Sequence, residues 1–457
     1  MSKIKKYSIL FILLVTLSNC KKNNAIENHF SREKQPFAFL LPQVAKVPGV
    51  PGKGYRAQDC GTCHTQIYQD WKKSTHSKAL SDIQFQAELA KKASPKWLCL
   101  NCHIPVANQR EFLVKSFIDN NILKPILVKN KNFDKSFQQE AVSCASCHIR
   151  IQEGTPTILA IRGTGLAPHP VKVAPERLRN VCQRCHDPKG EAVTPNLVCW
   201  FETSKEMKLA QENGSLPRSK VCSSCHMPKH QASLVPLFKN LPIRKTPQHF
   251  WLGSGIPKRY QDYKNLLIRG YRPAIDFKVK LISDKNILKN ILVTVSNKRS
   301  GHSFPTGDPE RFLLVIVKIL NSKGHVLQEL RKRIGQTWKW NPARKISDNR
   351  LKQNETRVLN FALIKDTNYH SVNITAYHVR VTSHTAQITS KTKNINESLL
   401  KDGAYLVKNI KKYYPLANKI YNEDIDIYSG RKIIQPLKKL ILESSHEKHK
   451  SLQDRAY

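Results

Sequence analysis

The pentapeptide Cys-x-x-Cys-His occurs five times between residues 60 and 226 of this 457-residue chain. Two thiols at this spacing can form thioether bonds to the two vinyl groups of one porphyrin, and the adjoining imidazole is then placed to bind its iron. Each copy therefore predicts one covalently attached haem c, five in all. The predicted haem-binding residues are Cys60, Cys63 and His64; Cys99, Cys102 and His103; Cys144, Cys147 and His148; Cys182, Cys185 and His186; and Cys222, Cys225 and His226.

Two other uses of paired cysteines fit this pattern less well. Zinc ribbons also contain Cys-x-x-Cys pairs, but a four-cysteine zinc site needs no histidine fixed to the second thiol. Disulfide frameworks are typical of small secreted domains, whereas a chain of this length with 40% apolar residues can bury ordinary hydrophobic cores. Haem attachment is therefore preferred over both.

The first 20 residues resemble an export signal. Lysines at positions 3, 5 and 6 precede an apolar run, Ile9–Val15, which is followed by Leu17-Ser18-Asn19-Cys20. That ending is similar to a lipoprotein cleavage site and predicts lipidation of Cys20; an ordinary cleaved signal and an uncleaved anchor are the alternatives. We therefore expect a periplasmic or cell-surface protein with a lipid anchor in a membrane. Export agrees with covalent haem attachment, which bacteria perform outside the cytoplasmic membrane.

The chain is strongly basic, with a formal net charge of +42. Ten haem propionates would reduce this charge to about +32, so the field of the complete protein stays positive. No basic motif interleaved with aromatic residues is present, which argues against nucleic acid as a partner. The charge is either a set of solvated lysines or a field that steers acidic redox partners, anionic lipid or small anions.

The hydrophobic pattern divides the rest of the chain into four segments. Residues 21–54 resemble a polar tether, and residues 55–275 hold all five motifs among short helical stretches and loops. Between residues 276 and 394, alternating segments and an apolar run predict a β-sandwich. Residues 395–457 predict a helical or frayed C-terminal tail. The expected fold class is α+β, a mainly helical or irregular multihaem cytochrome c domain followed by a β-sandwich domain.

The opposite face of each haem iron needs its own ligand or stays open to a substrate. Methionine is scarce: once the signal is removed only Met207 is a candidate, because Met227 directly follows His226. Histidine must then supply most of these positions, and bis-histidine ligation gives lower reduction potentials than His/Met ligation. Five of the twelve remaining histidines are predicted metal ligands: His76, His169, His230, His249 and His302.

Sequence context separates these five histidines from the other seven. His76 follows a short amphipathic segment, prolines stiffen the backbone around His169, and His249 begins an aromatic cluster. His230 follows the fifth motif by four residues, and His302 lies in a loop bounded by glycine and proline. The other histidines are expected to be solvated or tail residues (His29, His325, His446 and His449) or strand residues (His370, His378 and His384).

Several of these segments together resemble a family of exported multihaem c-type cytochromes. They are CGTCHTQIYQDWKKSTH, KWLCLNCHIPVANQ, FQQEAVSCASCH with a downstream APHP, CSSCHMPK, and GHSFPTG with DNRLKQNE, within residues 55–360. That family is related to the tetrahaem electron carrier of ammonia oxidisers, and more distantly to pentahaem nitrite reductases and octahaem hydroxylamine oxidoreductases. The resemblance implies distal ligation by His76, His169 and His302, closely stacked haem pairs, and a β domain that contributes a ligand. The Cys-x-x-Cys-Lys motif typical of the nitrite reductases is absent from this sequence.

Two functions are consistent with these features. We expect a pentahaem electron-transfer protein without catalytic residues, working with redox partner proteins such as other cytochromes or a membrane quinol-linked donor. The alternative is a haem oxidoreductase that acts on nitrite, hydroxylamine or a similar nitrogen or sulfur species at one open-faced haem. Cys199, an unpaired thiol, is expected to be a buried apolar cysteine, with a haem-adjacent or partner-linking thiol as the alternative.

Overall fold

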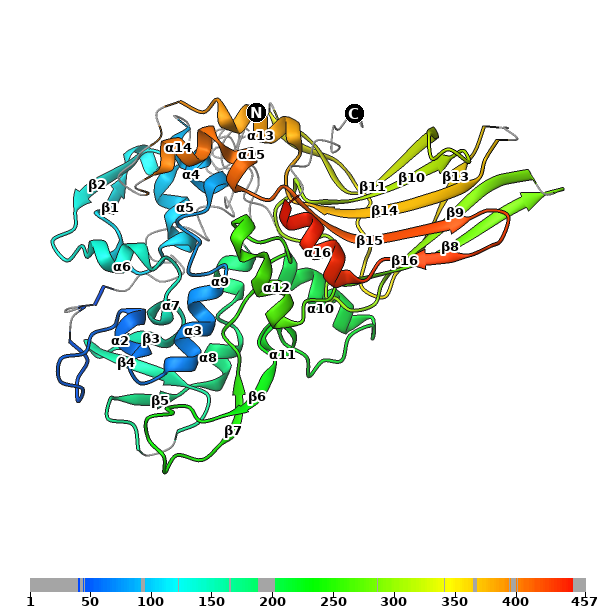
Figure 1. The fold of residues 1–457 in the computed structure, drawn as a ribbon. Coiled ribbons are helices and arrows are strands. Elements are labelled where there is room, and N and C mark those ends of the chain that lie inside the picture. The colour runs from blue at the N-terminus through cyan, green and yellow to red at the C-terminus, as the bar shows by residue number, and fades with distance from the viewer. Residues whose placement is uncertain are drawn as a thin grey trace, which may run out of the picture.

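The computed structural model consists of an N-terminal domain that carries the five motifs and a C-terminal β domain that extends away from it (Figure 1). It describes residues 40–41, 44, 46–91, 95–121, 123–163, 166–187, 202–285, 287–340, 342–364, 368–393, 395, 400 and 402–446. The predicted signal with Cys20, most of the predicted tether, His29, His449 and Cys199 lie outside the described residues. The fold class is α+β, which confirms the prediction.

The motif domain is built from short helices joined by loops. Side-chain caps begin two of them: the Asp82 carboxylate accepts from the Phe85 amide at 3.1 Å, and the Asp134 carboxylate accepts from the Phe137 amide at 2.8 Å. The helices are α2 (Ala57–Gly61), α3 (Thr65–Lys73), α4 (Ile83–Ala90), α5 (Lys96–His103), α6 (Lys135–Gln139), α7 (Cys144–His148), α8 (Pro175–Arg179), α9 (Gln183–His186), α10 (Thr203–Glu212), α11 (Cys222–His226) and α12 (Tyr263–Arg269), with 3-10 turns at Ala107–Gln109, Ile118–Asn120 and Tyr260–Asp262.

Small sheets border the motif domain. β1 pairs with β2, β4 lies between β3 and β5, and β6 pairs with β7. Their bounds are β1 (Phe112–Phe117), β2 (Pro125–Lys129), β3 (Ile149–Gln152), β4 (Thr155–Ala160), β5 (Val171–Val173), β6 (Lys229–Ala232) and β7 (Arg244–Pro247). Because these sheets are too small to form a core, they serve as connections between the motif helices.

The β domain consists of two antiparallel sheets with strand orders β12-β11-β10-β14-β15-β16 and β13-β9-β8. Its first strand begins at Ile275, one residue before the predicted boundary. The strands are β8 (Ile275–Asp284), β9 (Ile287–Asn297), β10 (Phe312–Leu320), β11 (Val326–Trp340), β12 (Ala343–Asp348), β13 (Thr356–Ala362), β14 (Ser371–Val379), β15 (Ala417–Asp426) and β16 (Lys432–Ile434).

The apolar run 312–320 is continuous because β10 is buried on both faces. Alternate residues, from Leu313 to Ile319, join a cluster that also contains Val293 and Val295 of the second sheet. Residues on the opposite face of the same strand, such as Leu314, form a separate cluster with Tyr377 and Ala417. The sandwich core and the buried reverse face together make β10 the centre of this domain.

The predicted helical or frayed tail, residues 395–457, does contain helices, but its described part also contributes two strands and packs against the rest of the protein. β15 pairs along the whole of β14, and β16 extends the same sheet. The helices α13 (Ser383–Ser390), α14 (Gly403–Lys408), α15 (Ile410–Tyr413) and α16 (Leu437–His446) pack back onto the motif domain. The high lysine content of this segment concealed its buried positions. His384, expected in a strand, lies in α13.

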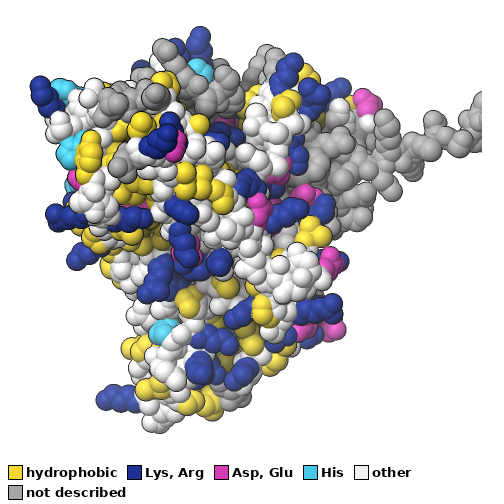
Figure 2. Space-filling view, turned by 90° about the vertical axis from the view of Figure 1, so that its right-hand side faces the viewer, with side chains coloured by type: hydrophobic (Ala, Val, Ile, Leu, Met, Phe, Trp, Pro, Cys, Tyr) yellow, Lys and Arg dark blue, Asp and Glu magenta, His cyan; other side chains and the backbone are white. Residues whose placement is uncertain are grey.

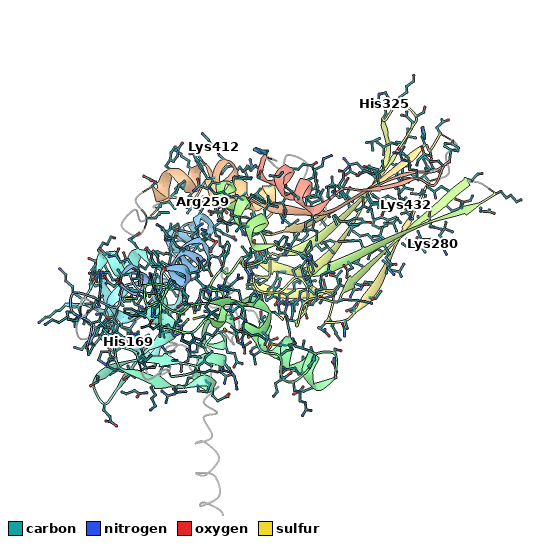
Figure 3. All side chains as sticks on the ribbon, turned by 60° about the horizontal axis from the view of Figure 1, so that its bottom comes forward. His169, Arg259, Lys280, His325, Lys412 and Lys432 are labelled. Carbon is teal, nitrogen blue, oxygen red and sulfur yellow. The ribbon has the colours of Figure 1, made fainter. Side chains whose placement is uncertain are left out.

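The surface agrees with the basic composition. Figure 2 shows Lys and Arg side chains spread over the face that it draws, with fewer Asp and Glu among them. Lys280, Lys432 and the exposed His325 lie on the β domain, far from His169 in the motif domain (Figure 3). Within the described part of the chain, no helix combines the length and the apolar character that a membrane crossing requires.

Helix α16 provides a test of C-terminal packing. Leu440 is 2% exposed, whereas Leu442, two residues along the same helix, is 45% exposed. Leu440→Ala should lower the free energy of unfolding by about 2 to 5 kcal/mol, because it leaves a cavity in a packed interior. Leu442→Ala should change it by less than about 0.5 kcal/mol. Urea unfolding followed by circular dichroism measures both, and equal effects of the two substitutions would contradict the packed arrangement.

Candidate haem-binding site

All ten motif cysteines and all five motif histidines line one continuous cavity in the motif domain. Its volume of about 3180 Å³ is several times the roughly 300 to 1,000 Å³ of a pocket for one small ligand. Predicted ligands His76, His169, His249 and His302 also line it, whereas His230 lies in β6 and is not part of the lining. One large cavity is what several adjoining porphyrins require.

The donor chemistry fits covalent haem attachment. Short helices carry most of the motifs, so the two cysteines of a motif, three residues apart, lie on the same helix face. The ten cysteines are free thiols, available for thioether bonds. In three motif histidines, His64, His103 and His148, Nδ1 lies 2.8 to 3.0 Å from a backbone carbonyl oxygen. A donated Nδ1–H fixes the tautomer and leaves Nε2 free for a metal.

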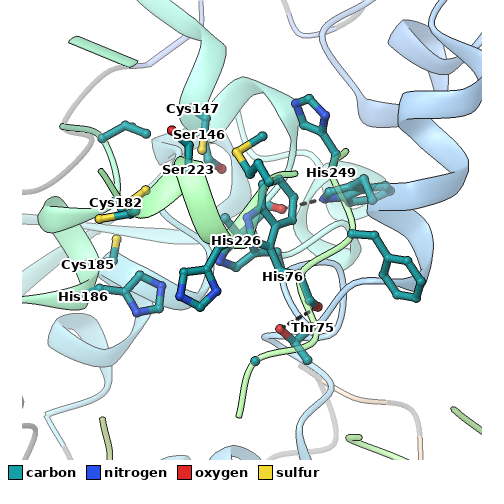
Figure 4. Close-up of a pocket in the computed structure, with 18 of the residues that line it drawn as sticks. Thr75, His76, Ser146, Cys147, Cys182, Cys185, His186, Ser223, His226 and His249 are labelled. Atoms are coloured by element: carbon teal, nitrogen blue, oxygen red, sulfur yellow. Dashed lines mark hydrogen bonds between the residues drawn. The ribbon is translucent and has the colours of Figure 1, made fainter. Parts of the chain in front are cut away.

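Three motif histidines face a second histidine from a distant part of the chain. Ring centroids are 6.0 Å apart for His76 and His186, 6.2 Å for His148 and His249, and 6.4 Å for His226 and His302. Figure 4 shows His76, His186, His226 and His249 turned into the same pocket. Metal–imidazole bonds of about 2.0 to 2.1 Å place two imidazoles on opposite sides of one metal with centroids about 6.3 Å apart. All three spacings match this value.

The first and second motifs differ in what faces their histidines. His169 lies near His64: burial first, and then the charge of His64, lowers the pKa of His169. His103 instead stacks on Phe85, with centroids 3.5 Å apart and planes within 3° of parallel. Among the described residues, no imidazole makes a ring contact with His103 or with the predicted ligand His230. The second motif therefore lacks, among the described residues, the ring pairing seen for His148, His186 and His226, although His384 of α13 lines the same cavity.

Burial keeps the cavity imidazoles neutral. Desolvation lowers the pKa of His76 and His249 to about 3 and the pKa of His186 and His226 to about 4. Burial also lowers the pKa of His302. Neutral imidazole is the form that binds a metal, so these side chains are in the ligating state near neutral pH.

Contacts between motifs link them into a network. Three pairs of thiols lie close enough for one member to raise the pKa of the other: Cys60 acts on Cys144, Cys185 on Cys102, and Cys222 on Cys182. The first motif therefore adjoins the third, and the fourth adjoins both the second and the fifth. Trp251 lies between the third and fourth motifs. Its ring centroid is 4.6 Å from that of His76, which faces the fourth motif, and 5.4 Å from that of His249, which faces the third.

A polar cluster fastens the His302 loop to the motif domain. The Glu206 carboxylate of α10 accepts hydrogen bonds from the Ser303 amide at 3.2 Å, the Thr306 hydroxyl at 2.9 Å and the Arg350 guanidinium at 2.6 Å. Within the β domain, the side-chain amide of Asn297 donates to the His302 carbonyl oxygen at 2.9 Å. These bonds hold the loop where the β domain meets the cavity.

Comparisons with known proteins agree with this site. A family model described as cytochrome c554 and c-prime matches residues 59–149, which contain the first three motifs. No curated protein sequence matches the chain. A solved pentahaem cytochrome c552 from Thermochromatium tepidum is similar over 80% of this chain and 97% of its own, with 19% identity and a TM-score of 0.53. That likeness shows a shared fold.

The five motifs, the cavity that they line and the family match over residues 59–149 support a multihaem c-type cytochrome. Haem c is accordingly the cofactor whose thioether and axial donors this chain supplies. Sequence reasoning missed three residues at the site: Phe85, Trp251 and Glu206. The aromatic cluster after His249 was a signal for Trp251, but the sequence around Phe85 and Glu206 gives no comparable sign.

Glu206 provides a test of loop positioning. Glu206→Gln should loosen the loop, because a neutral amide cannot replace a carboxylate that accepts from three donors and pairs with Arg350. We expect part of one low-spin haem signal to become high-spin in electron paramagnetic resonance of the oxidised protein. The matched control is Glu212→Gln on the same helix, where the carboxylate pairs only with the exposed Lys208. Identical spectra for the two variants would refute the positioning role.

Proposed function

We propose that this protein is a pentahaem c-type cytochrome that transfers electrons between redox partners outside the cytoplasm. The observation that carries the proposal is the set of three histidine pairs with centroids 6.0 to 6.4 Å apart. Each pair joins one motif histidine to a histidine from elsewhere in the chain. This spacing supports bis-histidine ligation, which closes both axial positions and suits electron transfer at low potential.

The contacts between motifs support a continuous electron path. The first motif adjoins the third through Cys60 and Cys144, and the third adjoins the fourth through His249, Trp251 and His76. The fourth motif adjoins the fifth and the second through thiol contacts. Every haem site therefore has a close neighbour, which a relay requires. The fourth site, with three neighbours, is the branch point of the proposed path.

The proposed partners are redox proteins with acidic surfaces, and the proposed location is the periplasm or the cell surface. The basic surface would steer such partners, because opposite fields accelerate encounter (Figure 2). Attachment to a membrane through lipidated Cys20 is part of the proposal and rests on the N-terminal signal pattern. A membrane quinol-linked donor or another cytochrome would then meet the protein at the membrane surface.

A second candidate function concerns the second motif. His103 has Phe85 beside it and, among the described residues, no imidazole in ring contact. A haem on Cys99 and Cys102 would then be the one with an exchangeable sixth position, and a small nitrogen or sulfur species is the class of substrate that could bind there. A stoichiometric high-spin ferric signal that nitrite or hydroxylamine shifts would support this oxidoreductase. An entirely low-spin spectrum that neither compound changes would exclude it.

Haem content tests the count of five. Intact mass analysis of the exported protein should exceed the polypeptide mass by five haem groups, because each motif supplies two thiols for one porphyrin. Cys225→Ser should lower the covalent haem signal by one fifth or weaken its attachment to a single thioether. A mature protein that carries fewer than five haems would contradict the pentahaem assignment.

His302 tests bis-histidine ligation. His302→Ala should leave the haem content intact, because no thioether is touched, and convert one low-spin haem to high-spin. The control is His325→Ala, which removes an exposed histidine of the same β domain (Figure 3). Optical and electron paramagnetic resonance spectra measure the change. Unchanged low-spin spectra in the His302 variant would remove this residue from the ligand set.

A further inference from the structure

Two arginines of the β domain lie opposite each other where the sandwich meets the cavity. β10 and β14 are antiparallel neighbours, and Phe312 pairs with Val379 at the end of their register. Arg311 and Arg380, the next residues outward, are therefore cross-strand neighbours. Like charges at opposed positions of a sheet destabilise it unless something offsets them. The two strands lie side by side, with these ends at the motif domain (Figure 1).

Arg380 is largely satisfied by the protein. One terminal nitrogen donates to the carbonyl oxygens of Pro257 and Pro415 at 3.0 and 3.2 Å, and the other donates to the Ile256 carbonyl. Its guanidinium also lies over the Tyr414 ring, 4.6 Å from the centroid. Its Nε, which is buried, has no hydrogen-bond partner. Carbonyl oxygens thus orient the group without neutralising its charge.

The guanidinium of Arg311 has fewer polar partners than that of Arg380. Its side chain makes no hydrogen bond or ion pair with any described residue, and its Nε is buried without a partner. Burial lowers the pKa of this guanidinium, and the Asp308 charge acts on it in the opposite sense without an ion pair. A guanidinium keeps its charge at neutral pH. Arg311 therefore faces the cavity as a cation without a direct counter-ion.

The neighbouring carboxylate, Asp82, is already engaged. It pairs with Lys258, and it accepts hydrogen bonds from the Phe85 amide at 3.1 Å and the Tyr414 hydroxyl at 3.2 Å. Its single charge acts on Lys258, Arg380 and Arg311 together, so these three cations exceed the negative charge that Asp82 and Asp308 supply. Burying a charge without a partner costs free energy, so an anion that enters the cavity here would be stabilised.

His378 lies on the same wall, as an uncharged imidazole, because burial lowers its pKa to about 3. It pairs with Leu313 across β10 and β14, so it lies on the same sheet face as Arg311 and Arg380. The residue is 4% exposed, its Nε2 has no hydrogen-bond partner, and its ring packs on Phe304 with centroids 4.9 Å apart. All three side chains line the cavity.

We propose that Arg311 and Arg380 bind an oxyanion inside the cavity. The oxyanion is either the carboxylate of a haem propionate or a small free anion such as phosphate. A guanidinium suits both because its planar fork matches two oxygens at once. The propionate source rests on the haem content proposed above, whereas the free-anion source does not depend on the electron-transfer role.

The experiment compares the haem-loaded full chain with Arg311→Gln and with Arg344→Gln, the control at an exposed arginine of the same domain. Resonance Raman spectroscopy reports the propionate bending bands, and calorimetric titration with inorganic phosphate reports free-anion binding. For a propionate, a bending band should shift in Arg311→Gln alone, and wild type should take up no phosphate. For a free anion, wild type should bind one phosphate, and Arg311→Gln should bind it at least tenfold more weakly with unchanged propionate bands.

The proposal would be overturned if Arg311→Gln left the propionate bands unchanged and the wild type bound no phosphate. It would also be overturned if Arg311→Gln and Arg344→Gln gave the same propionate bands and the same phosphate affinity. If Arg311→Gln does not accumulate with full haem, Arg311→Lys replaces it. Lysine keeps the charge but loses the planar fork, so the same changes should appear in weaker form. Intact mass separates this outcome from a failure of the pentahaem assignment, because haem number is measured on the same samples.

Discussion

The motif domain depends on filling its central cavity with bound porphyrin. Several of its motif helices are only four or five residues long, too short to be stable without tertiary contacts. Its own apolar clusters are small and lie around the cavity, as with the cluster of Leu80, Phe85 and Leu89. The β domain, by contrast, has a large continuous core between its two sheets. Porphyrin faces and axial bonds must therefore supply the interior that side chains provide elsewhere.

The two domains meet at the cavity as well as at the surface. The β domain contributes His302 to the cavity, and Glu206 of the motif domain holds the loop that carries this residue. The C-terminal segment adds a second connection, because α16 packs Ile441 against Tyr263 and Leu266 of α12. The junction is thus built from a cavity-lining histidine, a charged cluster and an apolar contact, each from a different part of the chain.

Local patterns in the sequence were sufficient to locate the five motifs and to predict the α+β class and several strands of the sandwich, since each depends on spacing over a few residues. His76 lies opposite His186, and His249 lies opposite His148, through contacts between segments far apart in the chain. The sequence therefore indicated which histidines could be distal ligands but not which motif each one faces. The packed C-terminal strand β15 was missed for a different reason. Two of its five buried positions carry polar residues, Asn418 and Glu423, which concealed the strand pattern.

The position of His302 has a consequence for how the protein matures. This histidine follows all five attachment motifs in the chain and belongs to a domain that must first assemble its own sheets. In the proposed exported protein, the thioether bonds of the fifth motif can form before the β domain is complete. The proposed axial bond from His302 must wait until that domain has folded and docked, so it would be the step that ends assembly.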